Sequence, residues 1–562
     1  MASLVGKRRG GRTYYYLVES ARVAGKPRIV AQQYLGSAEE VAARLSQAAP
    51  GEPARTRHRA FGDLAAAWQV LRRLQVARVV DEQVGSRRAD AAASVGTYLA
   101  LAALNRVVAP RSKLAFAGWW QSTAGDRLVR LPAAALDHRR FWDAMDALPV
   151  KALRAAERAI AARMVEVFDL DLAGLVLDMT NFATFVDSAN QRNTIAARGH
   201  AKQKRLDLRL VGLGLVVTAD GGVPVLSHAY QGNRPDVTQF SAVIDELVVR
   251  FGALARASDT LTVVYDAGCD SAEGQADIQA SPLHFVGSLR PSDHPDLLAV
   301  ARRRFQIVDA ERFEGLTALE TRTMALGADR RVILTHSEGF HLRQARGFEQ
   351  TLAKARRRLA TLQARLARGR TRRPRQAVEA EIAEILRPRW LSRVITWSLA
   401  GQEPASLRLH WRTDPAAKRQ LATELFGKRI LFTDREDWPL AEVVAAYRSQ
   451  ADVEAGFRQL KDPRVVSFSP MFHWTDQKIR VHVFYCVLAL AVAHLLRRQA
   501  AQAGLHMSVR ELLGTLAGIQ ETVLLYQGER GRPRARHLLT EMDPTQQRLY
   551  DLFGLDAYAP KR

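Results

Sequence analysis

The clearest pattern of hydrophobic and polar positions lies near the C-terminal end of the chain, in residues 446–461. Val453, Phe457 and Leu460, together with Ala446, recur at helical spacing and form an apolar stripe. Beside it runs a narrow polar strip, roughly 60° wide on a helix of 3.6 residues per turn, that contains Tyr447, Gln450, Glu454 and Lys461. We therefore expect a helix that packs one side and holds Glu454, partly buried and still accessible, at the edge of a core.

From residue 173 onward the pattern is typical of buried strands. Apolar runs occupy residues 174–178, 208–217, 223–229, 261–266 and 283–289, and residues 235–252 form an amphipathic helical segment. Two of these runs end in a carboxylate, at Asp178 and Asp266. Three strands, a helix, a strand, a helix and a strand is the order of an RNase H-like α/β domain. We predict that fold for the central region.

The remaining segments predict further parts around this core. We expect a basic β-hairpin unit at 1–55, a helical, DNA-end-binding domain at 56–168, the first part of the RNase H-like core at 169–300, a basic helical and β insertion at 301–430, the final part of the core at 431–500, and a basic helical tail at 501–562. Between His341 and Arg375 there are 12 Lys or Arg residues and one acid, Glu349. DNA contact is the favoured interpretation of this run, and a solvated helix face is the alternative.

Composition indicates a polyanionic partner. The net charge of +24 at pH 7 and a pI of about 10.5 favour nucleic acid as the partner. A high-GC genome would explain arginine in place of lysine, but it does not explain the excess of basic over acidic residues. Cys269 and Cys486 are too few for a zinc site and fit a reducing compartment. The N-terminus has no signal-peptide pattern, and the apolar segment 481–496 is too short to span a bilayer. We expect a buried helix there, no membrane, and a cytoplasmic location.

Asp178, Asp266 and Glu454 are the candidate catalytic residues. Three carboxylates at the rim of one sheet can hold two Mg²⁺ ions about 4 Å apart, which activate a water or a DNA 3′-hydroxyl and stabilise the leaving oxygen. For either aspartate taken alone, a turn cap is the commoner explanation. Two aspartates at the ends of apolar runs in the RNase H-like strand order, followed by Glu454, favour the metal site.

Several motifs carry a family resemblance. They are residues 177–180 (LDMT), 198–202 (RGHAK), 206–208 (LDL), 212–213 (GL), 232–236 (GNRPD) and 264–268 (VYDAG), followed by Tyr447, Glu454 and Lys461 at the spacing of a Tyr-x2-Arg-x3-Glu-x6-Lys motif. In these motifs the chain resembles bacterial insertion-sequence transposases of the DD-E type, over about residues 170–500. Gln450 stands where that family has arginine.

The resemblance implies a role for each matching residue. Asp178, Asp266 and Glu454 would hold two Mg²⁺ ions, with Mn²⁺ as a substitute, and Lys461 would contact a phosphate. Tyr447 would contact DNA and steady a flipped base during hairpin formation. Gln450 lacks the charge of the arginine that it replaces, and Arg448 and Arg458 are candidates to compensate. His200 and Lys202 either touch DNA or lie in a solvated basic loop.

The resemblance also implies a reaction and its partners. We expect cleavage at insertion-sequence ends and strand transfer into target DNA, by a homodimer on terminal inverted repeats and target DNA, close to the nucleoid. The alternatives are a nuclease that does not join strands and a transposase-derived DNA-binding protein that no longer cuts.

Overall fold

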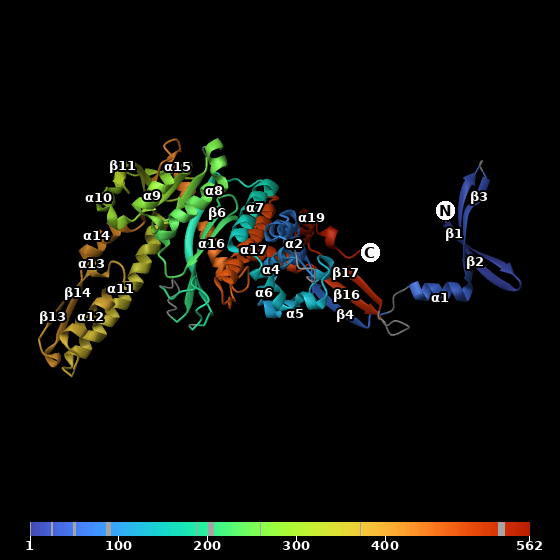
Figure 1. Cartoon of the computed structure of the whole chain (residues 1–562), viewed down its shortest axis with the longest axis horizontal. Helices are drawn as coiled ribbons and strands as arrows, with labels where there is room; N and C mark the ends of the chain where they lie inside the picture. The colour runs from blue at the N-terminus through green and yellow to red at the C-terminus, as the bar shows by residue number, and fades with distance from the viewer. Residues whose placement is uncertain are drawn as a thin grey trace. The chain divides into compact units, whose positions relative to one another are not determined.

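The structure is a computed structural model of the chain, drawn in Figure 1. It describes residues 2–23, 26–48, 52–85, 92–187, 189–199, 207–258, 260–370, 372–526 and 534–561. The chain divides into two compact units. The first comprises residues 1–66, 118–130 and 513–562, and the second comprises residues 67–117 and 131–512.

A large mixed sheet forms the centre of the second unit. In the described part of the chain it has nine strands in the order β10-β11-β12-β15-β9-β8-β5-β6-β7. Their bounds are β5 Gly174–Thr184, β6 Arg209–Thr218, β7 Pro224–Gln231, β8 Thr262–Tyr265, β9 His284–Leu289, β10 Gln306–Ile307, β11 Leu316–Ala325, β12 Ala328–Ser337 and β15 Lys428–Thr433. The long apolar runs of the sequence form the middle of this sheet, where both faces are buried.

The strand pairing within this sheet bears out the expected class. β5, β6 and β7 pair antiparallel in sequence order, and β8 and β9 add parallel to β5 on its other side. This mixed α/β arrangement is consistent with an RNase H-like transposase fold. One difference concerns residues 306–337, which were expected in the insertion. They form β10, β11 and β12 and extend the central sheet, because β15 pairs with β12 on one side and with β9 on the other.

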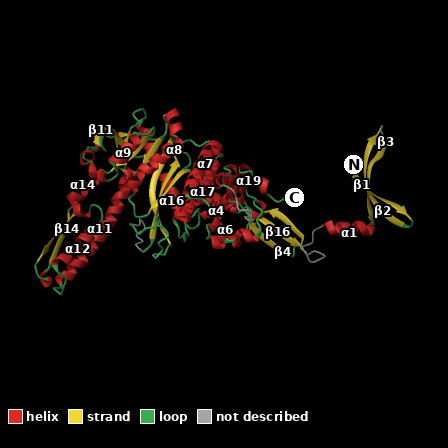
Figure 2. Cartoon of the chain, viewed as in Figure 1, coloured by secondary structure: helices red, strands yellow, loops and turns green. Residues whose placement is uncertain are grey.

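Helices cover both faces of the sheet (Figure 2). α8 (Phe240–Ser258) packs on one face, where a Cβ added at Gly214 of β6 would lie 3.6 Å from Val243. α16 (Gln450–Lys461) packs on the other face against β5, and α15 (Leu440–Arg448) precedes it. α9 (Ala272–Gln279) follows β8, and α10 (Pro295–Leu298) is a single short turn after β9.

α17 (Asp476–Gln502) is the long apolar helix of the second unit. Its length and mean hydropathy of 1.9 would suffice to cross a membrane, but 94% of its most apolar stretch is buried inside the protein. It contacts β7, α4 and α7. The expectation of a buried core helix in this segment is confirmed.

The region before the sheet is helical, as predicted. Its helices are α2 Gly62–Arg73, α3 Val76–Val84, α4 Val95–Val108, α5 Phe116–Gln121, α6 His138–Asp146 and α7 Val150–Phe168. α4 is buried along almost its whole length, between α3, α6 and α17. This explains why it shows little amphipathic pattern.

The remainder of the predicted insertion has a hydrophobic core of its own. It consists of α11 Glu338–Ala367, α12 Arg375–Leu386, α13 Leu391–Val394, β13 Ile395–Ala400, β14 Arg408–Thr413 and α14 Pro415–Leu425. The predicted leucine stripe, Leu352, Leu359, Leu362 and Leu366, is buried in this core. Gly369, with φ +63°, follows the end of α11 and lets the chain turn toward α12, which lies beside α11 (Figure 1).

The N-terminal segment contains three strands, one more than the expected hairpin. They are β1 Ala2–Arg9, β2 Arg12–Val23 and β3 Lys26–Ser37, followed by α1 Ala38–Ala48. β1 pairs with β2 through a turn at Gly10 and Gly11, which both have positive φ. Lys7, Arg8 and Arg9 therefore lie within a strand.

The C-terminal segment was expected to be helical, but the structure places two strands in it. β16 (Gln520–Tyr526) and β17 (Arg534–Leu539) form a sheet with β4 (Arg55–Ala60), in the order β17-β16-β4, between α18 (Val509–Ala517) and α19 (Pro544–Leu552). The pairing of β16 with β4 joins segments more than 450 residues apart in sequence. Local patterns do not show such a partner.

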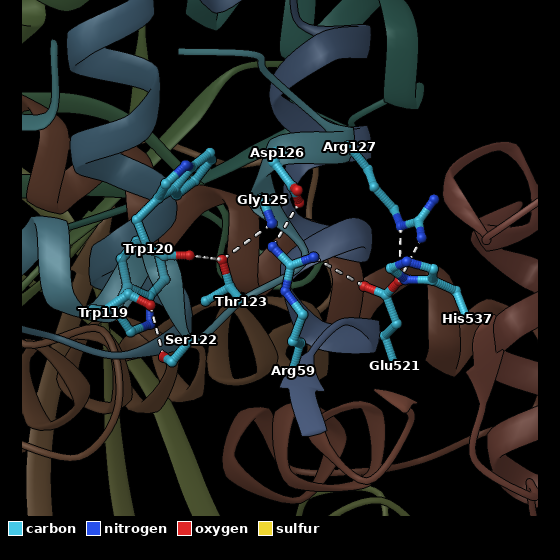
Figure 3. A network of polar contacts seen from close by, with 10 residues as sticks. All are labelled: Arg59, Trp119, Trp120, Ser122, Thr123, Gly125, Asp126, Arg127, Glu521 and His537. Carbon is cyan, nitrogen blue, oxygen red and sulfur yellow. Dashed lines mark hydrogen bonds and ion pairs between the residues drawn. The ribbon is translucent and has the colours of Figure 1, made fainter. Parts of the chain in front are cut away.

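A buried carboxylate stabilises this small sheet (Figure 3). Glu521 of β16 is fully buried and accepts hydrogen bonds from Arg127 (3.1 Å) and from His537 of β17 (2.5 Å). Arg59 of β4 lies 3.6 Å from Glu521 and donates to Asp126 at 2.7 Å. Burial alone would raise the pKa of Glu521, but the hydrogen bonds from Arg127 and His537 outweigh it and lower that pKa.

Candidate active site at the rim of β5 and β8

Asp178 and Asp266 occupy equivalent positions on neighbouring parallel strands. The register pairs Leu177 of β5 with Tyr265 of β8, so the two aspartates are the next residues on the two strands. Because side chains alternate along a strand, both carboxylates project from the same face. The sequence predicted that these two acids would meet at one rim of the sheet, and the register agrees with that.

Asp178 is not at the end of its strand, although the sequence predicted that it would be. β5 continues to Thr184 because β6 pairs with it along its full length, with Asp178 opposite Leu215. β8 ends at Tyr265, so the rim exists only on the β8 side of β5. Asp178 is half-buried there, and its carboxylate accepts a hydrogen bond from the backbone N–H of Met179 at 2.7 Å.

α16 lies over the face that carries these two aspartates. Thr180 shares the face of Asp178 and accepts a hydrogen bond from Nζ of Lys461 at 2.9 Å. A Cβ on Gly456 would lie 3.8 Å from Leu215, which is the cross-strand neighbour of Asp178. The helix that carries the third candidate acid therefore packs on the face that the first two acids share.

Three hydrogen bonds orient one oxygen of Asp266. Its Oδ1 accepts from the backbone N–H of Ala267 (2.8 Å), from Oγ of Ser288 (2.9 Å) and from the hydroxyl of Tyr447 (3.2 Å). Arg429 of β15 donates in turn to the Tyr447 hydroxyl at 3.0 Å. Oδ2 accepts no hydrogen bond from the described residues, so it is the oxygen available to a cation.

Tyr447 lies in the interior, and its side chain is only 6% exposed. Burial, and next the charge of Asp266, raise the pKa of its hydroxyl, which therefore stays protonated and acts as a donor. The DNA contact expected for Tyr447 stays a prediction. In this structure its hydroxyl supports Asp266.

Glu454 is more exposed than the sequence predicted. Its side chain is 61% exposed and forms an ion pair with Arg458 at 3.7 Å. Val453, Gly456, Phe457 and Leu460 face the sheet, which turns Glu454 toward solvent. Among the described residues, no group of three His, Cys, Asp or Glu side chains lies close enough together to hold a metal ion.

The donor set nevertheless has the right chemistry for a hard divalent cation. The carboxylates of Asp178 and Asp266 are the kind of ligand that Mg²⁺ and Mn²⁺ prefer. Glu454 lies on the helix that covers them, and its exposed side chain is not packed in place. The two aspartates fit a divalent cation, and the contribution of Glu454 to such a site stays a prediction.

The other predicted DNA-binding residues have different surroundings. Nε2 of Gln450 is buried without a hydrogen-bond partner among the described residues. Arg448 lies 4.6 Å from the ring of Phe313, and Arg458 pairs with Glu454. Two further predicted contacts, His200 and Lys202, lie outside the described residues.

Sequence reasoning missed several polar neighbours of the site. Ser288 and Arg429 belong to strands whose pairing was not predicted. Asp236 accepts a hydrogen bond from the hydroxyl of Tyr230 at 2.6 Å. It lies in the motif at residues 232–236, and the spacing of that motif was the signal that could have found it. Burial raises the pKa of Asp270 to about 7, and no sequence pattern indicated that burial.

The aspartates at this rim contribute negative potential, although Asp270 is partly protonated near neutral pH because its pKa is raised to about 7. Burial raises the pKa of the Cys269 thiol, and the charges of four aspartates add to that effect: Asp178, Asp236, Asp270 and Asp266. Such a potential attracts divalent cations and repels DNA phosphates. A cation at this rim would remove the conflict between an acidic centre and a nucleic-acid substrate.

Comparison with known proteins gives the family. Residues 171–469 match the family model described as "Transposase DDE domain". No curated protein matches the chain. Among solved structures, a piggyBac transposase synaptic complex with hairpin DNA aligns with a TM-score of 0.35 and 8% identity, over 83% of this chain and 82% of that one. The family match covers more than half of the 562 residues, including all three candidate acids. The chain belongs to the DDE-domain transposase family.

Proposed function

We propose that this protein is an active transposase that cleaves DNA at the ends of a bacterial insertion sequence and joins the freed ends to target DNA. The observation that carries the proposal is the register of β5 and β8, which presents Asp178 and Asp266 from one sheet face beneath α16. Such a pair, completed by Glu454, suits two-metal phosphoryl transfer.

Asp178, Asp266 and Glu454 would hold the metal ions, two Mg²⁺ or Mn²⁺ in place of them. When bound, the ions lower the pKa of the attacking water or 3′-hydroxyl and stabilise charge on the phosphate. The protein itself orients Asp266 through Ser288 and Tyr447 and positions α16 over β5 through Lys461 and Thr180. In that position Lys461 would lie beside the DNA strand that is cut.

The partners follow from the reaction. The substrates are the terminal inverted repeats of the element and a target duplex, and a homodimer would bring two ends together. The excess of 82 basic over 58 acidic residues supports duplex DNA as the partner and a place on the nucleoid in the cytoplasm.

A cleavage and joining assay on DNA that carries the element's ends tests the proposal. With Mg²⁺ the wild type should cut and join, and Asp266→Asn should lose both activities by at least about a hundredfold while it still binds the ends. Asp245→Asn is a matched control, because Asp245 is an exposed acid on α8, away from the site. It should retain full activity.

One observation favours a second candidate, a transposase-derived protein that binds DNA without cutting it. Glu454 lies apart from the two aspartates and pairs with Arg458. End binding by the wild type without any cleavage, in Mg²⁺ or Mn²⁺, would support that candidate and reject ours. Cleavage without joining would instead indicate a nuclease.

A further inference from the structure

The solvent side of α11 carries a row of positively charged side chains. The buried side of this helix is fixed by Phe348, Leu352, Ala355, Leu359, Leu362 and Leu366, which pack into the core of the insertion. At 100° per residue, five cations lie within about 60° of the opposite direction. They are Arg343, Arg346, Lys354, Arg357 and Arg368, which we call the basic stripe. All five are exposed.

The basic stripe has the length of a DNA contact. From Arg343 to Arg368 the helix rises roughly 38 Å, at 1.5 Å per residue. One turn of B-form DNA is about 34–36 Å long. No acidic residue lies within the stripe, and Arg356 and Arg358, both exposed, add charge at its flanks.

The cations of the stripe have no acidic partners among the described residues. The acids of the insertion pair with cations outside the stripe: Glu381 with Arg365 and Arg373, Glu379 with Arg375, Glu424 with Arg393, and Glu349 with Lys418. Arg322, which is also exposed, is paired with Asp329 and Glu436. The stripe therefore carries positive charge that no ion pair with a described acid neutralises.

Unpaired like charges three residues apart, such as Arg343 with Arg346 and Lys354 with Arg357, repel one another on a helix. That repulsion is relieved when an anion neutralises them. We propose that the basic stripe binds the phosphate backbone of duplex DNA along about one helical turn, independently of sequence. The inference rests on the proposed function, because that function makes duplex DNA the substrate.

The packing of α11 suits this role. Its apolar side is held by α12, β14 and the rest of the insertion core, so the stripe is presented on a rigid rod. Because the backbone of the helix is already ordered, binding to a duplex orders only the arginine and lysine side chains. Phosphate contacts of this kind position DNA without reading its bases.

The test uses the full chain in an Asp178→Asn background, so that no DNA is cut. The stripe variant is Arg343→Gln/Lys354→Gln/Arg357→Gln. Its matched control is Arg322→Gln/Arg387→Gln/Arg393→Gln, which removes the same charge from exposed, ion-paired positions. Binding to a 30-base-pair duplex without element sequence is measured between about 50 and 200 mM salt.

The stripe variant should bind about tenfold or more weaker, and the slope of log K against log salt should fall by roughly two to three, about 0.9 per lost phosphate contact. The control should stay within about twofold of its parent, since its arginines are already paired. Equal weakening of both variants, or of neither, would overturn the proposal. Circular dichroism verifies that α11 is intact. Should the wild type bind through the stripe but fail to cut, the proposed function would fall and this inference would stand.

Discussion

The hydroxyl of Tyr447 lies 3.2 Å from Oδ1 of Asp266, although the two residues are 181 positions apart in sequence. Ser288 contacts both of them, at 2.9 Å from Asp266 and 3.1 Å from Tyr447. A carboxylate with one oxygen held by donors presents the other oxygen in a fixed direction. This relationship connects the tyrosine of the Tyr-x2-Arg-x3-Glu-x6-Lys motif to the aspartate of residues 264–268.

Tyr447→Phe removes the hydroxyl and keeps the buried ring. We expect cleavage to fall about tenfold to a hundredfold, which is typical for residues that orient metal ligands. The apparent Mg²⁺ requirement should rise as well, while binding of element ends stays close to that of the wild type. Cleavage rates measured across a Mg²⁺ titration check this.

Ser288→Ala provides the comparison for that variant. Both donors act on the same oxygen of Asp266, so the double variant should lose less than the product of the two single losses. Tyr550→Phe, which removes a hydroxyl far from these residues in sequence, is the control. An unchanged Mg²⁺ requirement in Tyr447→Phe would contradict the proposal that the Tyr447 hydroxyl orients Asp266. The side chain would then contribute only through the packing of its ring.

Gln450→Arg restores the residue that the family motif has at this position. Nε2 of Gln450 is buried without a hydrogen-bond partner among the described residues, so the substitution removes no hydrogen bond of that nitrogen. A longer cationic side chain can extend to a phosphate. We expect binding of element ends to stay intact or become tighter, measured by mobility shift on labelled terminal repeats.

A large loss of end binding in Gln450→Arg would show that this position does not face DNA. Arg458→Gln tests the compensation hypothesis in parallel. Removal of Arg458 also releases Glu454 from its ion pair. Reduced end binding with unchanged or higher cleavage would therefore show that Arg458 contacts DNA and that its ion pair with Glu454 is not needed for cleavage.

Lys113 is a buried amine that lowers the stability of the fold. Its side chain is 6% exposed, lies 4.3 Å from the ring of Tyr485 and has no hydrogen-bond partner for Nζ among the described residues. Burial, and next the charge of Arg106, hold its pKa well below the ordinary value. Lys113→Met should raise the free energy of unfolding by about 1–3 kcal/mol at pH 7.

The sign of the pH effect follows from proton binding. Between the lowered pKa of the folded lysine and about 10.4, the unfolded lysine binds a proton that the folded one does not, so the wild type gains stability as pH rises through this range. The advantage of Lys113→Met should therefore shrink between pH 7 and pH 9 in urea unfolding. Lys151→Met, at an exposed position, should change little. A constant advantage across this range would mean that Lys113 is charged in the folded protein.

The sequence predicted most of the parts that position the site, because they depend on local patterns. Apolar runs marked β5, β6, β8 and β9, and the helical period marked α16. The runs placed Asp178 and Asp266 on neighbouring strands, although β5 continues beyond Asp178 and only β8 ends beside its aspartate. The leucine stripe of α11 was equally readable.

Features that depend on long-range pairing were not readable from the sequence. The full-length pairing of β5 with β6 carries the strand beyond Asp178, and β16 finds its partner in β4, at the other end of the chain. The helical period located Gln450, Glu454 and Lys461 on α16, but the single helix that was expected is interrupted at Ser449, so Tyr447 lies on α15. The packing of Val453 and Gly456 decided how far Glu454 turns toward solvent. Ser288 and Arg429 gave no local signal at all.

The most direct test of the account is the yield of joined product from labelled terminal-repeat DNA with Mg²⁺, compared between the wild type and Glu454→Gln. Glu454 is the acid that the structure leaves apart from the other two, and its role decides whether a three-acid centre exists. We predict that Glu454→Gln binds the ends as tightly as the wild type and loses cleavage and joining by at least about a hundredfold. Wild-type levels of joining by Glu454→Gln would contradict it.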